Sequence, residues 1–176
     1  VLPRIGGSFV GRVEDESGKA VENAIVRVGT GRLDAIRRMG AQPRVHQVRT
    51  DAHGDFVAHG ISEGEHRIDA RAEGYCLTTK RASVRPGQRA PVRLVLTPES
   101  VVRGVVRDAF GETVRDARFS WGEDGTLEHV RARTDRYGRY EMRGLSAGPT
   151  ILLCAHREFG SAERKITTVA GQVHDI

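Results

Sequence analysis

Two blocks of the sequence recur at fixed offsets, and this internal repeat limits the fold more strongly than any other feature of the chain. Residues Gly11–Val28 align without gaps to Gly104–Trp121, at an offset of 93 residues. Residues Thr50–Phe56 align to Thr134–Tyr140 at an offset of 84 residues, so the first copy carries nine extra residues between its blocks. Because one structural unit is written twice within 176 residues, we expect two small domains of similar fold.

Each copy has the pattern of short strands joined by tight turns. Small or apolar residues at Phe9, Gly11 and Val13 alternate with other positions, as in a strand with one buried face. Residues 24–28 continue this alternation, and Asp51–Gly54 has the composition of a tight hairpin loop. The pattern predicts an all-β fold, with about seven strands in each copy arranged as a two-sheet sandwich.

The boundary between the copies falls in the short segment Thr97–Ser100. We therefore expect one sandwich over residues 1–98 and a second over residues 99–176. Ile176 aligns with Val92, so the counterpart of Arg93–Leu96 would lie beyond the last residue. The alignment predicts that the second sandwich lacks part of its last strand, as in a fragment of a longer protein.

The repeated residues form a recognisable pattern: Gly11-x-Val13-x-Asp15-x-x-Gly18, then Thr50-Asp51-x-x-Gly54-x-Phe56, then Gly60-Ile61-x-x-Gly64. In both copies this pattern resembles the carboxypeptidase regulatory-like domain. The resemblance implies a transthyretin-like (prealbumin-like) β-sandwich, used as an accessory module in exported or cell-surface proteins beside peptidases, adhesins or outer-membrane transporters. That family has no shared catalytic residues, so the resemblance assigns none to this chain.

Residues suited to catalysis or metal binding do not occur in the spacing that such sites need. The seven histidines include no pair two residues apart, the spacing that would put two ligands on one strand face. Cys76 and Cys154 occupy non-equivalent positions in the two copies. Asp51 and Asp135 open hairpin loops and are expected to cap their own turns. We predict no catalytic residue, no cofactor and no metal site.

The basic residues concentrate in one segment. The chain has a net charge of +5, and residues 27–49 hold six arginines and one acid. Within the predicted loop 29–47, three apolar residues recur at three-residue spacing among three arginines: Leu33, Ile36 and Met39 with Arg32, Arg37 and Arg38. Two interpretations stay open: a docking element for an acidic protein or glycan, or a solvated loop whose apolar residues pack onto the sandwich. A nucleic-acid partner is not expected, because no aromatic residue interleaves with these arginines.

A second unusual feature is the apolar run at Ile151–Leu153. Ile151 and Leu153 align with Arg67 and Asp69, which are expected to face solvent in the first copy. This strand of the second copy is therefore predicted to be apolar on both faces. Either another domain covers its outer face, or the two side chains are isolated surface aliphatics.

These observations favour a noncatalytic role. The predicted function is that of a spacer, or of a protein- or glycan-binding module, within a larger exported protein at the periplasm or cell surface. The alternative is an accessory that positions or stabilises a neighbouring catalytic domain. No run of about 18 apolar residues occurs, so no membrane-spanning segment is predicted.

Overall fold

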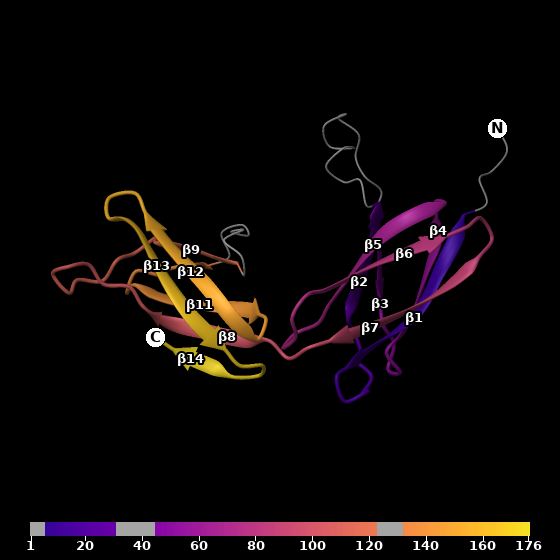
Figure 1. Ribbon diagram of the computed structural model, residues 1–176, viewed down its shortest axis with the longest axis horizontal. Helices are drawn as coiled ribbons and strands as arrows, with labels where there is room; N and C mark the ends of the chain where they lie inside the picture. The colour runs from indigo at the N-terminus through magenta and orange to yellow at the C-terminus, as the bar shows by residue number, and fades with distance from the viewer. Residues whose placement is uncertain (1–5, 31–44, 123–131) are drawn as a thin grey trace. The chain divides into compact units, whose positions relative to one another are not determined.

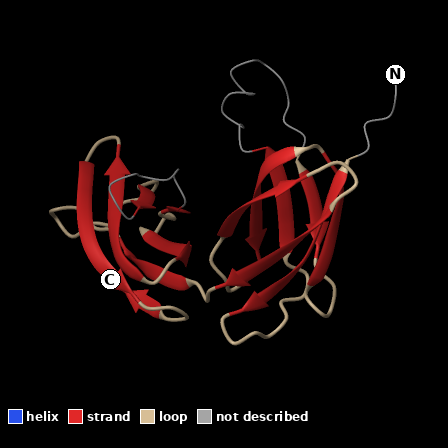
Figure 2. Ribbon diagram, turned by 45° about the vertical axis from the view of Figure 1, so that its right-hand side comes forward, coloured by secondary structure: helices blue, strands red, loops and turns tan. Residues whose placement is uncertain are grey.

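The computed structural model describes residues 6–30, 45–122 and 132–176. The chain divides into two compact units, Val1–Thr97 and Pro98–Ile176, one residue before the boundary drawn from the repeat. Among the described residues, each unit has seven strands and no helix (Figure 2). The predicted all-β fold of two tandem sandwiches is confirmed. None of the described residues forms a helix long and apolar enough to cross a membrane.

The first unit contains a three-stranded sheet and a four-stranded sheet (Figure 1). The small sheet has the order β4-β1-β7 and the larger sheet the order β3-β2-β5-β6. The strands are β1 (Gly7–Asp15), β2 (Ile25–Thr30), β3 (His46–Arg49), β4 (Asp55–Ile61), β5 (Gly64–Arg71), β6 (Thr78–Val84) and β7 (Arg89–Leu96). Strand β7 runs parallel to β1 along the sheet edge, which accommodates Pro91, a residue without a backbone N–H donor.

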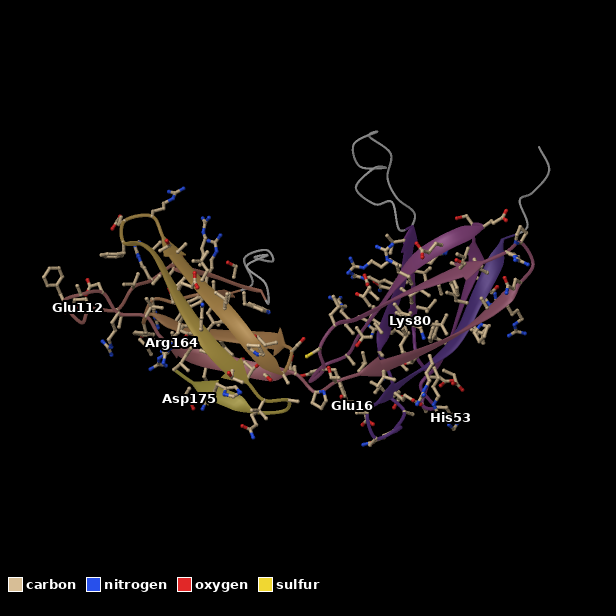
Figure 3. The ribbon with its side chains drawn as sticks, in the orientation of Figure 1. Glu16, His53, Lys80, Glu112, Arg164 and Asp175 are labelled. Carbon is tan, nitrogen blue, oxygen red and sulfur yellow. The ribbon has the colours of Figure 1, made fainter. Side chains whose placement is uncertain are left out.

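The second unit repeats this arrangement. Its sheets have the orders β11-β8-β14 and β10-β9-β12-β13. The strands are β8 (Ser100–Val105), β9 (Arg118–Gly122), β10 (Ala132–Arg133), β11 (Arg139–Leu145), β12 (Gly148–His156), β13 (Gly160–Thr168) and β14 (Val173–Asp175). Strand β14 pairs with three residues of β8, whereas β7 pairs with eight residues of β1. Asp175 lies on β14 (Figure 3). Arg103 on β8 donates hydrogen bonds to both of its carboxylate oxygens, at 2.5 and 3.2 Å.

The residues predicted to point inward form the core of each sandwich. Phe9, Val13 and Val26 are fully buried in the first unit, as are Ile68 and Leu94. These side chains alternate along their strands with more exposed ones, because successive residues of a strand point to opposite faces. The second unit has a smaller core: Val102, Phe119, Tyr140, Met142, Leu145 and Leu152.

The first glycine of the repeat is explained by a close approach of two strands. A Cβ atom on Gly11 would lie 1.9 Å from the carbonyl oxygen of Val92 and 2.9 Å from the Phe56 ring. A Cβ atom on Gly104 would lie 2.1 Å from the carbonyl oxygen of Ile176. In both units the parallel pair β1–β7 or β8–β14 therefore has room only for glycine at this position.

Candidate functional site

The aspartates of the repeat cap their own turns, as predicted. Asp51 Oδ1 accepts hydrogen bonds from the backbone N–H groups of His53 and Asp55, at 2.8 and 2.9 Å. Asp135 Oδ1 accepts the equivalent two bonds in the second unit, also at 2.8 and 2.9 Å. His53 lies in this turn and is exposed (Figure 3). These carboxylates are thus engaged in holding the hairpins closed.

Hydrogen bonding also changes the acidity of two of these groups. The backbone N–H of Asp55, followed by that of His53, lowers the pKa of Asp51 below its ordinary value, because these donors stabilise the charged carboxylate. The hydroxyl of Ser17, 2.6 Å from Asp15 Oδ1, is the main cause of a lowered pKa at Asp15. Both lowered pKa values belong to aspartates that accept hydrogen bonds within their own turns.

The threonines of the repeat are buried, and their hydroxyls join the segment after one strand to the segment before its neighbour. Thr50 Oγ1 accepts the N–H of Ala24 at 2.8 Å and donates to the carbonyl oxygen of Val21 at 2.7 Å. Thr134 Oγ1 accepts the N–H of Ala117 at 2.9 Å in the second unit. Together with the aspartates, they show that the polar residues of the repeated motif serve the fold.

The predicted basic loop is shorter than residues 29–47. Strand β2 continues to Thr30 and β3 begins at His46, where Val28 pairs with His46 and Arg27 with Gln47. Sequence alternation did not reveal these ends because Gly29 and Thr30 carry no clear apolar periodicity. The six residues proposed for docking lie outside the described residues: Arg32, Leu33, Ile36, Arg37, Arg38 and Met39.

Ile151 and Leu153 lie on β12, alternating with the buried Leu152. Both side chains are half-buried. Ile151 is opposite Lys165 on β13, and Leu153 is opposite Glu163. The outer face of this strand therefore places two aliphatic side chains beside two charged ones.

One histidine is buried and has a structural role. His66 is buried in the first unit, where its Nε2 lies 2.7 Å from the carbonyl oxygen of Ser62. Its ring also meets Phe9 edge-on, with centroids 5.9 Å apart. The sequence did not indicate this burial, because His66 directly follows the exposed hairpin end at residues 62–65. In the structure, His66 is the first inward-facing residue of β5.

The cysteines and the other ligand-type residues do not combine into a site in the described part of the chain. Cys76 is buried in the first unit, and Cys154 is half-buried in the second. Burial raises the pKa of Cys154, which disfavours the reactive thiolate. Among residues 6–30, 45–122 and 132–176, no three His, Cys, Asp or Glu side chains are grouped to hold a metal ion.

The most distinctive surface of the second unit is a groove of about 820 Å³ beside the turn that joins β12 to β13. We call it the arginine groove. Its charged and aromatic lining comes from three parts of the unit: Arg115, Asp116, Arg118, Arg133, His156, Arg157, Glu158 and Phe159. The lining contains four arginines and two acidic residues, so the groove carries a net positive charge. Sequence reasoning missed this groove because its arginines are far apart along the chain.

The sequence model of the carboxypeptidase regulatory-like domain matches residues 8–97, which is more than half of the chain. The chain belongs to this family. The matched residues cover the first carboxypeptidase regulatory-like sandwich, and the second unit repeats its fold and its turn hydrogen bonds. A comparison with curated proteins found no match.

Solved structures similar to this carboxypeptidase regulatory-like chain include the Bacillus anthracis TIE protein, with 16% identity and a TM-score of 0.42 over 97% of this chain and 33% of that one. A streptococcal ancillary pilin has 14% identity and a TM-score of 0.46, over 98% of this chain and 61% of the pilin. The chain thus spans about a third and three fifths of these proteins. A 3-chlorocatechol 1,2-dioxygenase from Rhodococcus opacus has 12% identity and a TM-score of 0.37, over 52% of this chain and 60% of the dioxygenase.

Proposed function

We propose that the chain is a noncatalytic module of a larger exported or cell-surface protein, in which two β-sandwiches act as a spacer and present a binding surface to a protein or glycan. One observation carries this proposal. The polar side chains shared by both copies are engaged in the fold: Asp51 and Asp135 in turns, Thr50 and Thr134 between segments that flank the strands. A motif whose carboxylates and hydroxyls are committed to backbone groups supports a scaffold role rather than acid–base or nucleophilic chemistry.

The surfaces around this shared frame differ between the copies, which supports a binding role beyond spacing. The first copy has the basic segment that contains Arg32, Arg37 and Arg38, which we propose as a docking element for an acidic partner. The second copy has the arginine groove and the half-buried pair Ile151 and Leu153. We assign that aliphatic pair to contact with an adjacent domain of the parent protein.

A domain swap within the parent protein tests this proposal. Residues 98–176 are replaced by a second copy of residues 7–97 in which Arg32, Arg37 and Arg38 are changed to Gln. Two sandwiches then remain, the surfaces of the second unit are lost, and the basic segment is not duplicated. Export and protease accessibility on intact cells should persist, while binding to cell-surface glycans or proteins should fall.

Three results would count against the proposal in different ways. Retention of the parent protein inside the cell would overturn its exported location, and unchanged binding after the swap would reduce the second unit to a spacer. A loss of turnover or thermal stability in a neighbouring catalytic domain would instead favour the accessory role.

A further inference from the structure

The arginine groove has the charge and layout of an anion-binding site. We propose that it binds the carboxylate or sulfate groups of an acidic polysaccharide. This inference rests on the proposed function, because it names the ligand class for one surface of the binding module. Its volume of about 820 Å³ lies within the range of about 300–1,000 Å³ that is typical of ligand pockets.

The groove arginines are available to a ligand. No hydrogen bond or ion pair joins the side chains of Arg115, Arg118, Arg133 or Arg157 to another residue in the described part of the chain. Other arginines of this protein have acidic partners, such as Arg143, whose Nε lies 2.6 Å from Glu141. A guanidinium that has no protein partner presents its N–H donors to solvent or to an anion.

Two of these arginines are direct neighbours. Arg118 on β9 is paired in register with Arg133 on β10. Like charges directly opposite each other on adjacent strands repel and destabilise the sheet. An oxyanion held between two guanidinium groups removes this repulsion and accepts paired N–H bonds from each planar fork. The Arg118–Arg133 pair is therefore the centre of the proposed site.

The equivalent sheet of the first unit lacks such a pair of adjacent arginines. On its other side Arg118 is opposite Ala155, so the row across the second unit has two adjacent arginines and a small side chain. The equivalent row of the first unit separates its two arginines by an aliphatic residue: Arg49, Ile25 and Arg71. Glu22 and Glu73 replace the other two groove arginines there, as the alignment of the copies shows. The positive groove is thus particular to the second copy.

The rim of the groove favours a sugar over an acidic peptide. The side chain of Phe159 is 57% exposed in the turn after β12, and its ring centroid lies 5.0 Å from that of His156. The backbone N–H of Glu158 donates to His156 Nδ1 at 3.2 Å, which fixes the imidazole beside the phenyl ring. An exposed aromatic face beside guanidinium groups matches a sugar ring, which has an apolar C–H face, hydroxyls and an acid group within one rigid unit.

Binding of the full 176-residue chain to four probes tests the proposal: oligogalacturonate for carboxylates, heparin oligosaccharide for sulfates, oligo-L-glutamate for acidic peptides and dextran for neutral glycans. Measurements at about 0.15 M salt, where charges are screened beyond about 8 Å, limit non-specific attraction. We expect saturable binding to one or both acidic oligosaccharides, with amide shifts in NMR spectra at residues 115–118 and 156–159. The preferred probe identifies the acid group.

Two triple variants of equal charge change locate the site. Replacing Arg115, Arg118 and Arg133 with Gln should weaken binding by about tenfold or more, since paired charged hydrogen bonds are lost. The control replaces Arg71, Arg85 and Arg89, three exposed arginines of the first unit, with Gln and should keep affinity within about twofold. The groove variant should melt at or above the wild-type temperature because it loses a like-charge pair. If it does not fold, Arg118→Gln alone serves the same comparison.

The variant Phe159→Ser tests whether the groove binds acidic oligosaccharides through the aromatic ring, which an acidic peptide would not need. It should weaken oligosaccharide binding while leaving the melting temperature unchanged, because the ring lies at the surface. Equal affinity of the two triple variants, tighter binding of oligo-L-glutamate than of either oligosaccharide, or no binding to either acidic oligosaccharide would overturn the proposal. The parent-protein swap reads out export separately, so failure here leaves the spacer role intact.

Discussion

Thr50 and Ala24 lie on different segments of the first sandwich and are joined by a hydrogen bond of 2.8 Å from the backbone N–H of Ala24 to the Thr50 hydroxyl. Replacing Thr50 with Val preserves the side-chain shape and removes both of its hydrogen bonds. The buried N–H of Ala24 then has no acceptor, so we expect a loss of about 1–3 kcal/mol in the free energy of unfolding. Thermal and urea unfolding measure this change.

Thr50→Ser is the matched control, because it keeps the hydroxyl and removes only a methyl group. It should cost less than Thr50→Val. Thr134→Val should have the corresponding effect on the second unit, whose hydroxyl accepts the N–H of Ala117 at 2.9 Å. An equal loss for the Val and Ser variants would mean that packing, rather than hydrogen bonding, explains the threonine.

A second prediction concerns Gly11, whose position is crowded although its backbone is extended. Gly11→Ala places a methyl group against the carbonyl oxygen of Val92, which belongs to a paired strand and cannot move freely. We expect a loss of about 2 kcal/mol or more, because overpacking a close strand contact typically costs about 1–3 kcal/mol.

Gly18 provides the comparison for Gly11, since it has open space around it and a φ of 83°. Gly18→Ala should cost about 1 kcal/mol from the left-handed backbone, and Gly18→Asn should cost less because Asn tolerates that conformation. If unfolding curves show a smaller loss of stability for Gly11→Ala than for Gly18→Ala, then β1 and β7 can move apart to accommodate a side chain.

A third prediction concerns acid. The pKa of Asp51 and that of Asp15 are lowered in the folded protein from an ordinary value of 3.8. A carboxyl whose folded pKa is depressed stabilises the fold fully above its unfolded pKa, and this contribution is lost as the pH falls through the folded pKa. The melting temperature should therefore fall as the pH drops below about 4.

The Asp51→Asn variant isolates this effect, because its amide oxygen still accepts turn hydrogen bonds but does not titrate. Its melting temperature should be lower than that of the wild type at neutral pH and should change less between about pH 5 and pH 2. An unchanged acid slope in a variant with both Asp15→Asn and Asp51→Asn would assign acid sensitivity to other carboxyls.

The sequence predicted the frame of each sandwich well because the repeat compares two solutions to the same folding problem. Gly11 and Gly104 match because each meets a carbonyl oxygen, of Val92 on the parallel strand β7 and of Ile176 directly after the parallel strand β14. Asp51 and Asp135 match because both cap a hairpin. These requirements depend on the local backbone, so they can be recognised from the residue type alone. The ends of β2 and β3 were missed because pairing across the sheet, rather than side-chain periodicity, extends them.

The arginine groove was harder to predict because it depends on which strands become neighbours. Arg118 and Arg133 are separated by residues that the repeat does not align, and only the pairing of β9 with β10 brings them together. A comparison of the copies does contain part of the signal, since Arg118 replaces the aliphatic Ile25. That change is read as a site only once the register of the sheet is known.

The last prediction concerns Glu14 and Arg93, an ion pair between β1 and β7 whose glutamate side chain is only 10% exposed. Replacing Arg93 with Met keeps the aliphatic stem and leaves the Glu14 carboxylate with Arg12 as its nearest cation, at 4.0 Å. Because Arg93 itself is 71% exposed, we expect a loss of about 1–2 kcal/mol, below that of a fully buried pair. The double variant Glu14→Met with Arg93→Met should be more stable than Arg93→Met alone, since no carboxylate is then left unpaired. Urea unfolding of the four proteins in this cycle gives the coupling energy, and a value near zero would mean that solvent already satisfies the carboxylate.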